Sequence, residues 1–159
     1  MSSVKAAGKK DENKICPGNK GGNDTVRMTF LNDHNKKRSS LARGLEPDPL
    51  SPTGFAPKAI RMQKMIYDCE VEASAMKHAQ KCEFKHSSSG FGENLFKIDD
   101  TGRDQAGLAL WADELWWGEL KEIGVGPVPK ITKELMARKV GHYTQVSSTI
   151  WSEANSMNF

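Results

Sequence analysis

The segment from residue 103 to residue 123 constrains the fold more than any other part of the chain, because it predicts a long helix with one apolar face. At about 100° of rotation per residue, most of its apolar side chains fall within a sector about 140° wide. They are Leu108, Ala109, Ala112, Leu115, Trp116, Leu120 and Ile123, whereas Leu110 and Trp117 fall on the far side. Such a face has to be covered by a second layer of secondary structure, so the chain is expected to fold around a single core.

Glu119 is the anomaly on this helix, because it falls well inside the apolar sector. Gln105 is the other polar side chain there, and Asp113 falls just beyond the edge of the sector. A carboxylate that faces a core is costly unless it is paired or hydrogen-bonded. Glu119 is therefore either a structural residue with an internal hydrogen bond or part of a functional site.

The rest of the chain predicts further helices and a late strand region. Apolar spacing indicates helices at about 24–43, 58–81 and 130–138. Residues 45–57 contain four of the seven prolines and predict an extended loop. From residue 140 to 151 β-branched residues alternate with others, which predicts one or two strands. Long helices followed by strands indicate the α+β class.

Composition limits the function classes. The chain has 159 residues, which predicts one domain, and its 23 basic and 20 acidic side chains are too evenly balanced for a dedicated nucleic-acid-binding protein. No apolar run approaches the ~18 residues that a membrane span requires. Residues 1–24 lack a signal-peptide core and predict a disordered tail before a single domain at 25–159. Asn23 begins an Asn-Asp-Thr glycosylation sequon, which has meaning only on the secretory route.

Two histidines and two glutamates could form a divalent-metal site. His86 and Glu93 flank a Ser- and Gly-rich loop in KHSSSGFGENLF, and His142 lies in VGHYTQV. With Glu119 they supply two imidazole ligands and two carboxylates that could contact the metal or its water. Their spacing alone is weak support, since the chain has neither an HExxH motif nor paired CxxC motifs. The other two histidines, His34 and His78, are interpreted as structural.

Motifs from about residue 16 to residue 151 resemble the CAP superfamily, which comprises cysteine-rich secretory proteins, antigen 5 and pathogenesis-related proteins. The chain is most similar to the venom-allergen-like, activation-associated secreted proteins of parasitic nematodes. The matching segments, in order, are FLNDHNKKRSSLARG (30–44), MIYDCEVEASAMKHAQKC (65–82), HSSSGFGENLF (86–96), WADELWWGELKEIGV (111–125) and GHYTQV (141–146).

The resemblance implies a three-layer α–β–α sandwich whose cleft is lined by a tetrad of His86, Glu93, Glu119 and His142. It implies that the two histidines bind zinc, magnesium or another divalent cation and that the two glutamates orient them or contact water. Helix geometry and the resemblance thus single out Glu119 independently. The resemblance also implies that Cys69 and Cys82 belong to disulfides, that Cys16 corresponds to a cysteine near the mature N-terminus, and that the protein is secreted.

The sequence departs from the family pattern near its C-terminus. Residues 147–149 resemble a three-residue insertion within a strand, which would reverse side-chain facing beyond it unless it bulges out. The chain stops at Phe159, about where the family has a Gly-Cys pair, so the late strands are expected to be missing from a C-terminally incomplete domain. An unpaired edge is then expected at 146–151, with poor solubility and weakly cooperative unfolding.

The leading functional hypothesis is a secreted, non-enzymatic CAP-domain protein. It would act by binding host or extracellular proteins, or a lipid or sterol, in roles such as immune modulation. The enzymatic alternative is a metal-dependent hydrolase with His86 and His142 as ligands and Glu93 or Glu119 as general base. No recognisable nucleophile elbow or protease motif supports that alternative. A third hypothesis is a non-functional product of a truncated transcript or gene model.

Overall fold

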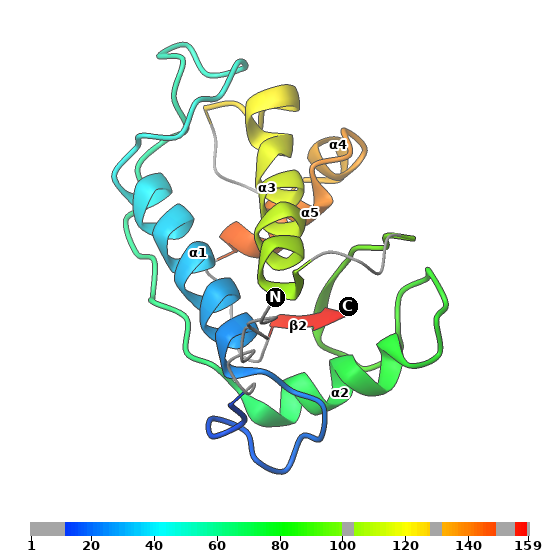
Figure 1. The fold of residues 1–159 in the computed structure, drawn as a ribbon. Helices are drawn as coiled ribbons and strands as arrows, with labels where there is room; N and C mark the ends of the chain where they lie inside the picture. The colour runs from blue at the N-terminus through cyan, green and yellow to red at the C-terminus, as the bar shows by residue number, and fades with distance from the viewer. Residues whose placement is uncertain (1–11, 100–103, 128–131, 149–154, 159) are drawn as a thin grey trace, which may run out of the picture.

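The computed structural model of the chain describes residues 12–99, 104–127, 132–148 and 155–158 (Figure 1). Within these ranges the chain forms both helices and strands, which confirms the predicted α+β class. The elements, in order, are α1 (Asp24–Ala42), α2 (Cys69–Ala79), β1 (Gly92–Leu95), α3 (Gln105–Ile123), α4 (Lys133–Met136), α5 (Gly141–Ser147) and β2 (Asn155–Asn158).

The two strands form a small parallel sheet between two helical layers. Gly92 of β1 pairs with Asn155 of β2, and Leu95 pairs with Asn158. α2 packs against β2, while α3 packs against both α1 and α5, and α5 also contacts β1 (Figure 1). This helix–sheet–helix order is that of the predicted sandwich, with two strands in the part of the chain that the structure describes.

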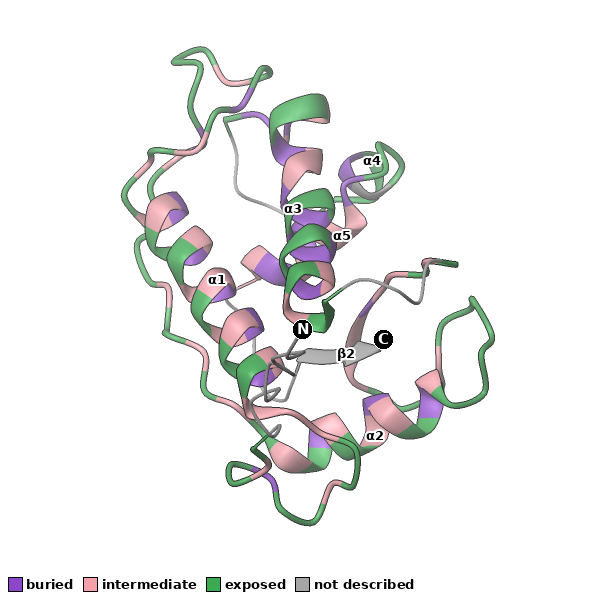
Figure 2. Cartoon of the chain, viewed as in Figure 1, coloured by how far each residue is buried: buried purple, intermediate pink, exposed green. Residues whose placement is uncertain are grey.

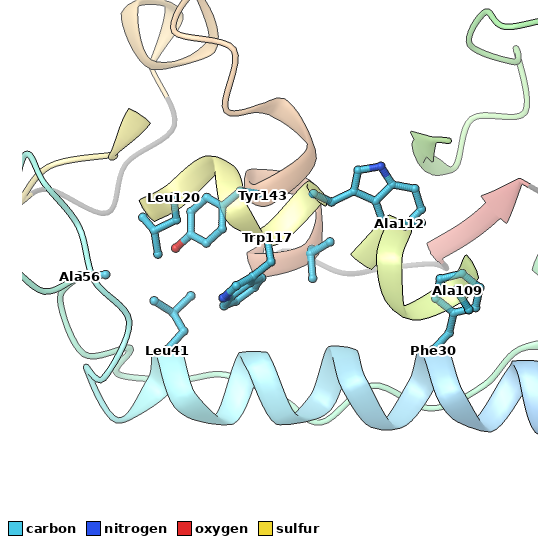
Figure 3. Close-up of a cluster of buried hydrophobic side chains, with 10 residues drawn as sticks. Phe30, Leu41, Ala56, Ala109, Ala112, Trp117, Leu120 and Tyr143 are labelled. Atoms are coloured by element: carbon cyan, nitrogen blue, oxygen red, sulfur yellow. The ribbon is translucent and has the colours of Figure 1, made fainter. Parts of the chain in front are cut away.

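The hydrophobic core lies where α1, α3 and α5 meet (Figure 3). The ring of Phe30 on α1 is stacked on Trp116 of α3, with centroids 6.4 Å apart. Trp117 meets Tyr143 of α5 edge to face at 5.1 Å. These aromatic contacts join all three helices, so the position of each helix depends on the other two.

Along α3, buried and exposed residues lie on different sides of the helix (Figure 2). The residues on the buried side show that this face is rotated from the predicted one. Leu115 is 52% exposed, whereas Trp117 and Asp113 are buried. Oδ2 of Asp113 lies 3.2 Å from both Nδ1 of His34 and Nζ of Lys37, which α1 contributes. Burial acts to raise the pKa of the Asp113 carboxyl, but the neighbouring His34 and Lys37 outweigh it and lower that pKa. Residue hydrophobicity alone therefore missed an ion-pair cluster within the helix interface.

The strand predicted from residue 140 is wrong for residues 141–147, which form α5. Tyr143 and Val146, three residues apart, both point into the core. Arg38 of α1 donates from Nη1 to the carbonyl oxygen of Val146 at 2.8 Å. Packing against α1 and α3 thus outweighs the weak strand preference of the β-branched residues.

The helix α5 also overlaps two predictions for the C-terminal part of the chain, the strand insertion at 147–149 and the unpaired sheet edge at 146–151. Ser147 ends the helix, so the insertion does not begin inside a strand, and Val146 is not at a sheet edge. The remaining part of both predictions, at 149–151, lies outside the described residues.

The second helix begins at Cys69, not at 58 as predicted. Asp68 is its N-cap and accepts a hydrogen bond from the Glu70 N–H at 2.8 Å. The preceding residues are extended beside α1, where the side chain of Asn35 bonds both the N–H and the carbonyl oxygen of Met65, at 2.8 and 3.0 Å. A side chain of α1 therefore satisfies backbone groups that a helix would have satisfied internally.

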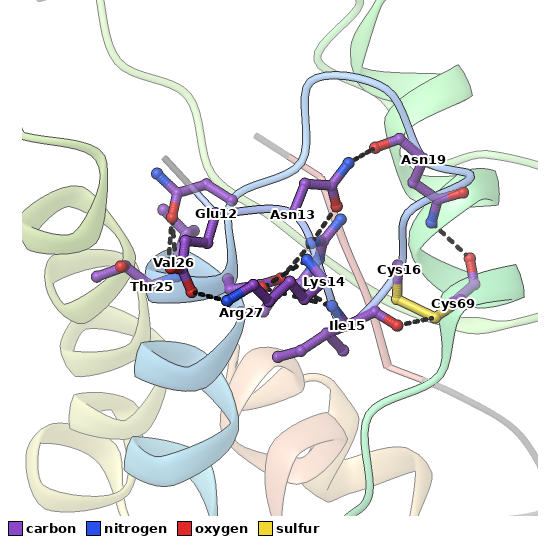
Figure 4. Close-up of polar contacts among 12 residues, drawn as sticks. Glu12, Asn13, Lys14, Ile15, Cys16, Asn19, Thr25, Val26, Arg27 and Cys69 are labelled. Carbon is purple, nitrogen blue, oxygen red and sulfur yellow. Dashed lines mark hydrogen bonds and ion pairs between the residues drawn. A yellow bond between two sulfur atoms is a disulfide. The ribbon is translucent and has the colours of Figure 1, made fainter. Parts of the chain in front are cut away.

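Residues 12–23 are part of the fold, which corrects the prediction of a disordered tail for this stretch (Figure 4). Cys16 is 2% exposed and forms a disulfide with Cys69. Oδ1 of Asn13 accepts a hydrogen bond from Arg27 at 2.6 Å, and Asn19 donates to the Cys69 carbonyl oxygen at 2.8 Å. Local composition does not reveal these contacts with α1 and α2. Residues 1–11 lie outside the described residues.

The proline-rich segment 45–57 is a loop, as predicted, and it anchors the end of α3. The buried Asp48 carboxylate accepts the backbone N–H of Gly126 at 2.9 Å. Gly124 has a φ of 82°, and a Cβ atom there would lie 2.6 Å from Asp48 Oδ1. Glycine is therefore required where the chain leaves α3.

Candidate functional site

His86 and Glu93 form the first pair of the site, where the loop before β1 meets the strand. Nδ1 of His86 lies 2.9 Å from Oε1 of Glu93, and the backbone N–H of Ser87 donates to the same oxygen at 2.8 Å. The Glu93 side chain is 5% exposed, whereas that of His86 is 68% exposed. A buried carboxylate thus anchors an imidazole that faces solvent.

Glu119 and His142 form the second pair, between α3 and α5. Nδ1 of His142 lies 2.6 Å from Oε1 of Glu119, and the Tyr143 N–H donates to Oε2 at 3.0 Å. Because the buried face of α3 is rotated, Glu119 lies at the edge of that face and not within it. It is therefore largely shielded and hydrogen-bonded, while the His142 side chain remains 41% exposed.

The protein around the second pair restricts the imidazole further. The ring of Trp116 is stacked on His142, with centroids 6.3 Å apart and an interplanar angle of 15°. Burial raises the pKa of Tyr143, the residue that follows His142, above the ordinary value of a tyrosine. Its role beside the site is packing against Trp117.

β1 and α5 are joined directly, which brings the two pairs into one region. The buried side chain of Asn94 donates from Nδ2 to the carbonyl oxygen of His142 at 3.1 Å. A Cβ atom on Gly92 would lie 1.8 Å from Nε2 of Gln145, so glycine permits this close approach. Sequence reasoning missed Asn94 and Gln145. The sequence does show that Asn94 is a polar residue next to Glu93 in a short strand, but it does not show that Asn94 bonds the backbone of His142.

The tetrad supplies side chains of the chemical type that binds metals, but the way they are grouped supports a metal site less clearly. Each imidazole uses Nδ1 toward a carboxylate, which is the arrangement that orients metal-binding histidines through Nε2. In the described ranges, however, no three His, Cys, Asp or Glu side chains are grouped closely enough to hold an ion together. The metal assignment of His86 and His142 therefore stays a prediction.

Asn23 lies apart from the tetrad and caps α1. Its side-chain oxygen accepts the Thr25 N–H at 2.8 Å. This contact gives Asn23 a structural role as an N-cap and leaves its glycosylation a prediction. Among the described cysteines, Cys69 forms a disulfide with Cys16, and Cys82 is free and exposed.

A cavity of about 600 Å³ lies between α1, α2, α3 and the chain that follows β1. Apolar side chains from these elements form most of its wall, among them Val26, Phe30, Met76, Phe96 and Leu108. At one end of the cavity, Nε of Arg27 lies 2.8 Å from Oε1 of Glu72. The cavity thus combines a long apolar wall with a charged end, which suits an amphipathic ligand.

None of the described helices is both long and apolar enough to cross a membrane.

Comparison with known proteins identifies the family. The model of the cysteine-rich secretory protein (CAP) family matches residues 31–157. The chain is 51% identical over 144 residues to Ancylostoma secreted protein of Ancylostoma caninum, covering 86% of this chain and 34% of that protein. It is 26% identical over 151 residues to venom allergen 3 of Solenopsis invicta, covering 87% of this chain and 60% of that protein. The chain thus spans between about a third and three fifths of the length of these relatives.

Solved structures agree with the sequence matches. The crystal structure of Na-ASP-1 superposes with a TM-score of 0.84 and 48% identity, covering 91% of this chain and 38% of that one. The crystal structure of NaASP2 with Zn²⁺ superposes with a TM-score of 0.78 and 46% identity, covering 83% of this chain and 70% of that one. The resemblance carried by the tetrad motifs is therefore confirmed: this chain belongs to the cysteine-rich secretory protein (CAP) family and is a nematode venom-allergen-like member of it.

Proposed function

We propose that this chain is an extracellular, non-catalytic binding protein whose His86 and His142 hold a divalent cation such as zinc. The observation that carries the proposal is that each imidazole has its Nδ1 engaged by a carboxylate. This contact selects the tautomer whose Nε2 lone pair is available to a metal. Glu93 and Glu119 are then orienting residues, not direct ligands.

The relatives support an extracellular location and a cation. Their names include a secreted protein and a venom allergen, and NaASP2 was crystallised with Zn²⁺. The described part of this chain also contains a disulfide, between the buried Cys16 and Cys69, and disulfides are typical of oxidising compartments. The cation would then have a structural role, because it would link His86, in the loop before β1, to His142 of α5.

The partner of this binding protein is proposed to be a host or extracellular protein, or a lipid or sterol. The apolar cavity of about 600 Å³ supports the lipid alternative, because its volume is in the range of small-molecule sites. Immune modulation of a host would follow from either kind of partner.

Zinc titration calorimetry tests the metal site. We expect wild-type protein to bind zinc and both His86→Ala and His142→Ala to weaken binding at least about tenfold, because each removes one nitrogen ligand. His78→Gln is the matched control, since Nε2 of His78 instead bonds the Lys85 carbonyl oxygen at 2.7 Å.

Unchanged zinc affinity in both alanine variants would remove the metal assignment. Turnover of ester or peptide substrates by the wild-type protein, lost in Glu119→Gln, would instead support the hydrolase alternative.

A further inference from the structure

Residues 58–66 form an extended segment that runs beside α1 (Figure 1). Arg38 and Asn35 of α1 hold it in place. Nη2 of Arg38 donates to the Gln63 carbonyl oxygen at 2.9 Å, and Asn35 bonds the backbone of Met65. The segment is therefore fixed on the surface by backbone contacts, and most of its side chains remain free to face outward.

The exposure of these side chains repeats every three residues, as in an extended polyproline-like chain. Ala59, Met62 and Met65 are half-buried and form the inward row. Two outward rows lie beside it. The cationic row is Lys58, Arg61 and Lys64, and the isoleucine row is Ile60, Gln63 and Ile66, in which a glutamine separates the two isoleucines.

The isoleucine row exposes two large aliphatic side chains. Ile60 is 106% exposed, and Ile66, which also contributes to the wall of the cavity, is 86% exposed. Each isoleucine thus keeps its hydrophobic surface in water although the neighbouring backbone is anchored. Aliphatic side chains that alternate with cations can insert where lipid headgroups meet acyl chains.

The cationic row is distinguished by the surroundings of its charges. Within the ranges that the structure describes, no carboxylate lies within ion-pair distance of Lys58, Arg61 or Lys64. Lys58, Arg61 and Lys64 thus alternate along one segment with the exposed Ile60 and Ile66, and a surface of this composition can meet anionic headgroups and an acyl boundary together.

We propose that residues 58–66 form a docking surface for an anionic phospholipid bilayer. The cationic row would face the lipid headgroups, while Ile60 and Ile66 enter the interface between headgroups and acyl chains. Charge complementarity alone would also suit a sulfated polysaccharide, but such a partner gives the two isoleucines no apolar contact. The proposal concerns the partner of the binding function proposed above and does not require the His86 and His142 site.

Vesicle co-sedimentation in the presence of a chelator tests the proposal without the metal site. We expect the wild-type protein to sediment with vesicles of phosphatidylcholine and phosphatidylserine and not with phosphatidylcholine alone. Each cation near an anionic surface contributes about fivefold to partitioning. The triple variant Lys58→Glu, Arg61→Glu, Lys64→Glu should therefore bind at least about 100-fold more weakly. The double variant Ile60→Ser, Ile66→Ser should lose about tenfold or more, since it removes the inserted apolar groups.

The matched control reverses three exposed lysines on other elements, Lys77 of α2, Lys121 of α3 and Lys133 of α4, each to Glu. It changes the net charge equally and should reduce vesicle binding much less. Equal loss in this control and in the cationic-row variant would overturn the site. Unchanged binding of the isoleucine variant, or retention on immobilised heparin without vesicle binding, would overturn the bilayer as partner. Thermal unfolding of every variant checks that the fold is retained, since the altered side chains are exposed.

Discussion

Each imidazole of the site is held by a carboxylate that also accepts a backbone N–H from a neighbouring residue. Glu93 receives the Ser87 N–H, and Glu119 receives the Tyr143 N–H, which follows His142 in α5. A single glutamate therefore fixes both the ring and the backbone that carries it, and this double contact sets the direction in which Nε2 points. The structural and functional interpretations of Glu119 are thus compatible.

Replacing Glu119 by Gln should separate these two roles. The amide retains one acceptor oxygen, so one of the two hydrogen bonds that the carboxylate accepts is lost. We expect the free energy of unfolding to fall by about 1–3 kcal/mol and zinc affinity to fall about 10–100-fold. Urea unfolding and zinc titration measure the two effects. Glu114→Gln, on the exposed face of the same helix, should change stability by less than about 0.5 kcal/mol. Equal effects of the two substitutions would contradict the orienting role.

At the scale of elements, covalent and side-chain contacts decide where the N-terminal segment and α2 lie. The disulfide between Cys16 and Cys69 closes a separation of 53 residues and attaches residues 12–23 to the first residue of α2. Arg27 then lies between Asp24 and Glu72, 2.7 Å and 2.8 Å from their carboxylates. The N-terminal segment, α1 and α2 are therefore stabilised together.

Loss of the disulfide should loosen this group of elements. A disulfide over such a separation restricts the unfolded chain and thereby adds about 2–4 kcal/mol to the free energy of unfolding. Cys16→Ser is expected to lower the free energy of unfolding by that amount, as measured in urea. Cys82→Ser is the control, because Cys82 is free and exposed, and it should have little effect. A Cys16→Ser variant as stable as the wild type would show that the non-covalent contacts are sufficient.

At the scale of the whole molecule, a cavity lies where the layers meet. Its walls come from α1, α2, α3 and the chain after β1. No local stretch of sequence indicates such a cavity, because its walls come from residues as far apart as Val26 and Leu108. The layers are held by the core at one side of the molecule, where α1, α3 and α5 meet.

Filling the cavity should compete with the proposed lipid ligand. Leu108→Trp places a larger ring at the wall of the cavity and removes room for about three methylene groups of the ligand. Each buried methylene group contributes about 0.8 kcal/mol to binding. Titration with a fluorescent long-chain fatty acid should therefore show affinity roughly fiftyfold lower than in the wild type. Leu110→Trp, on the exposed side of α3, should bind as the wild type does. Equal binding by both variants would place the ligand elsewhere.

The sequence by itself determined the α+β class, the family and the apolar character of α3, because these depend on residue types and spacing along the chain. It also identified the His86, Glu93, Glu119 and His142 set. Only the tertiary structure decided that residues 141–147 are helical, that Asp113 is buried and that Asn94 joins β1 to α5. These outcomes depend on side chains distant in sequence, such as Arg38 and His34, whose hydrogen bonds and charges outweigh weak local preferences.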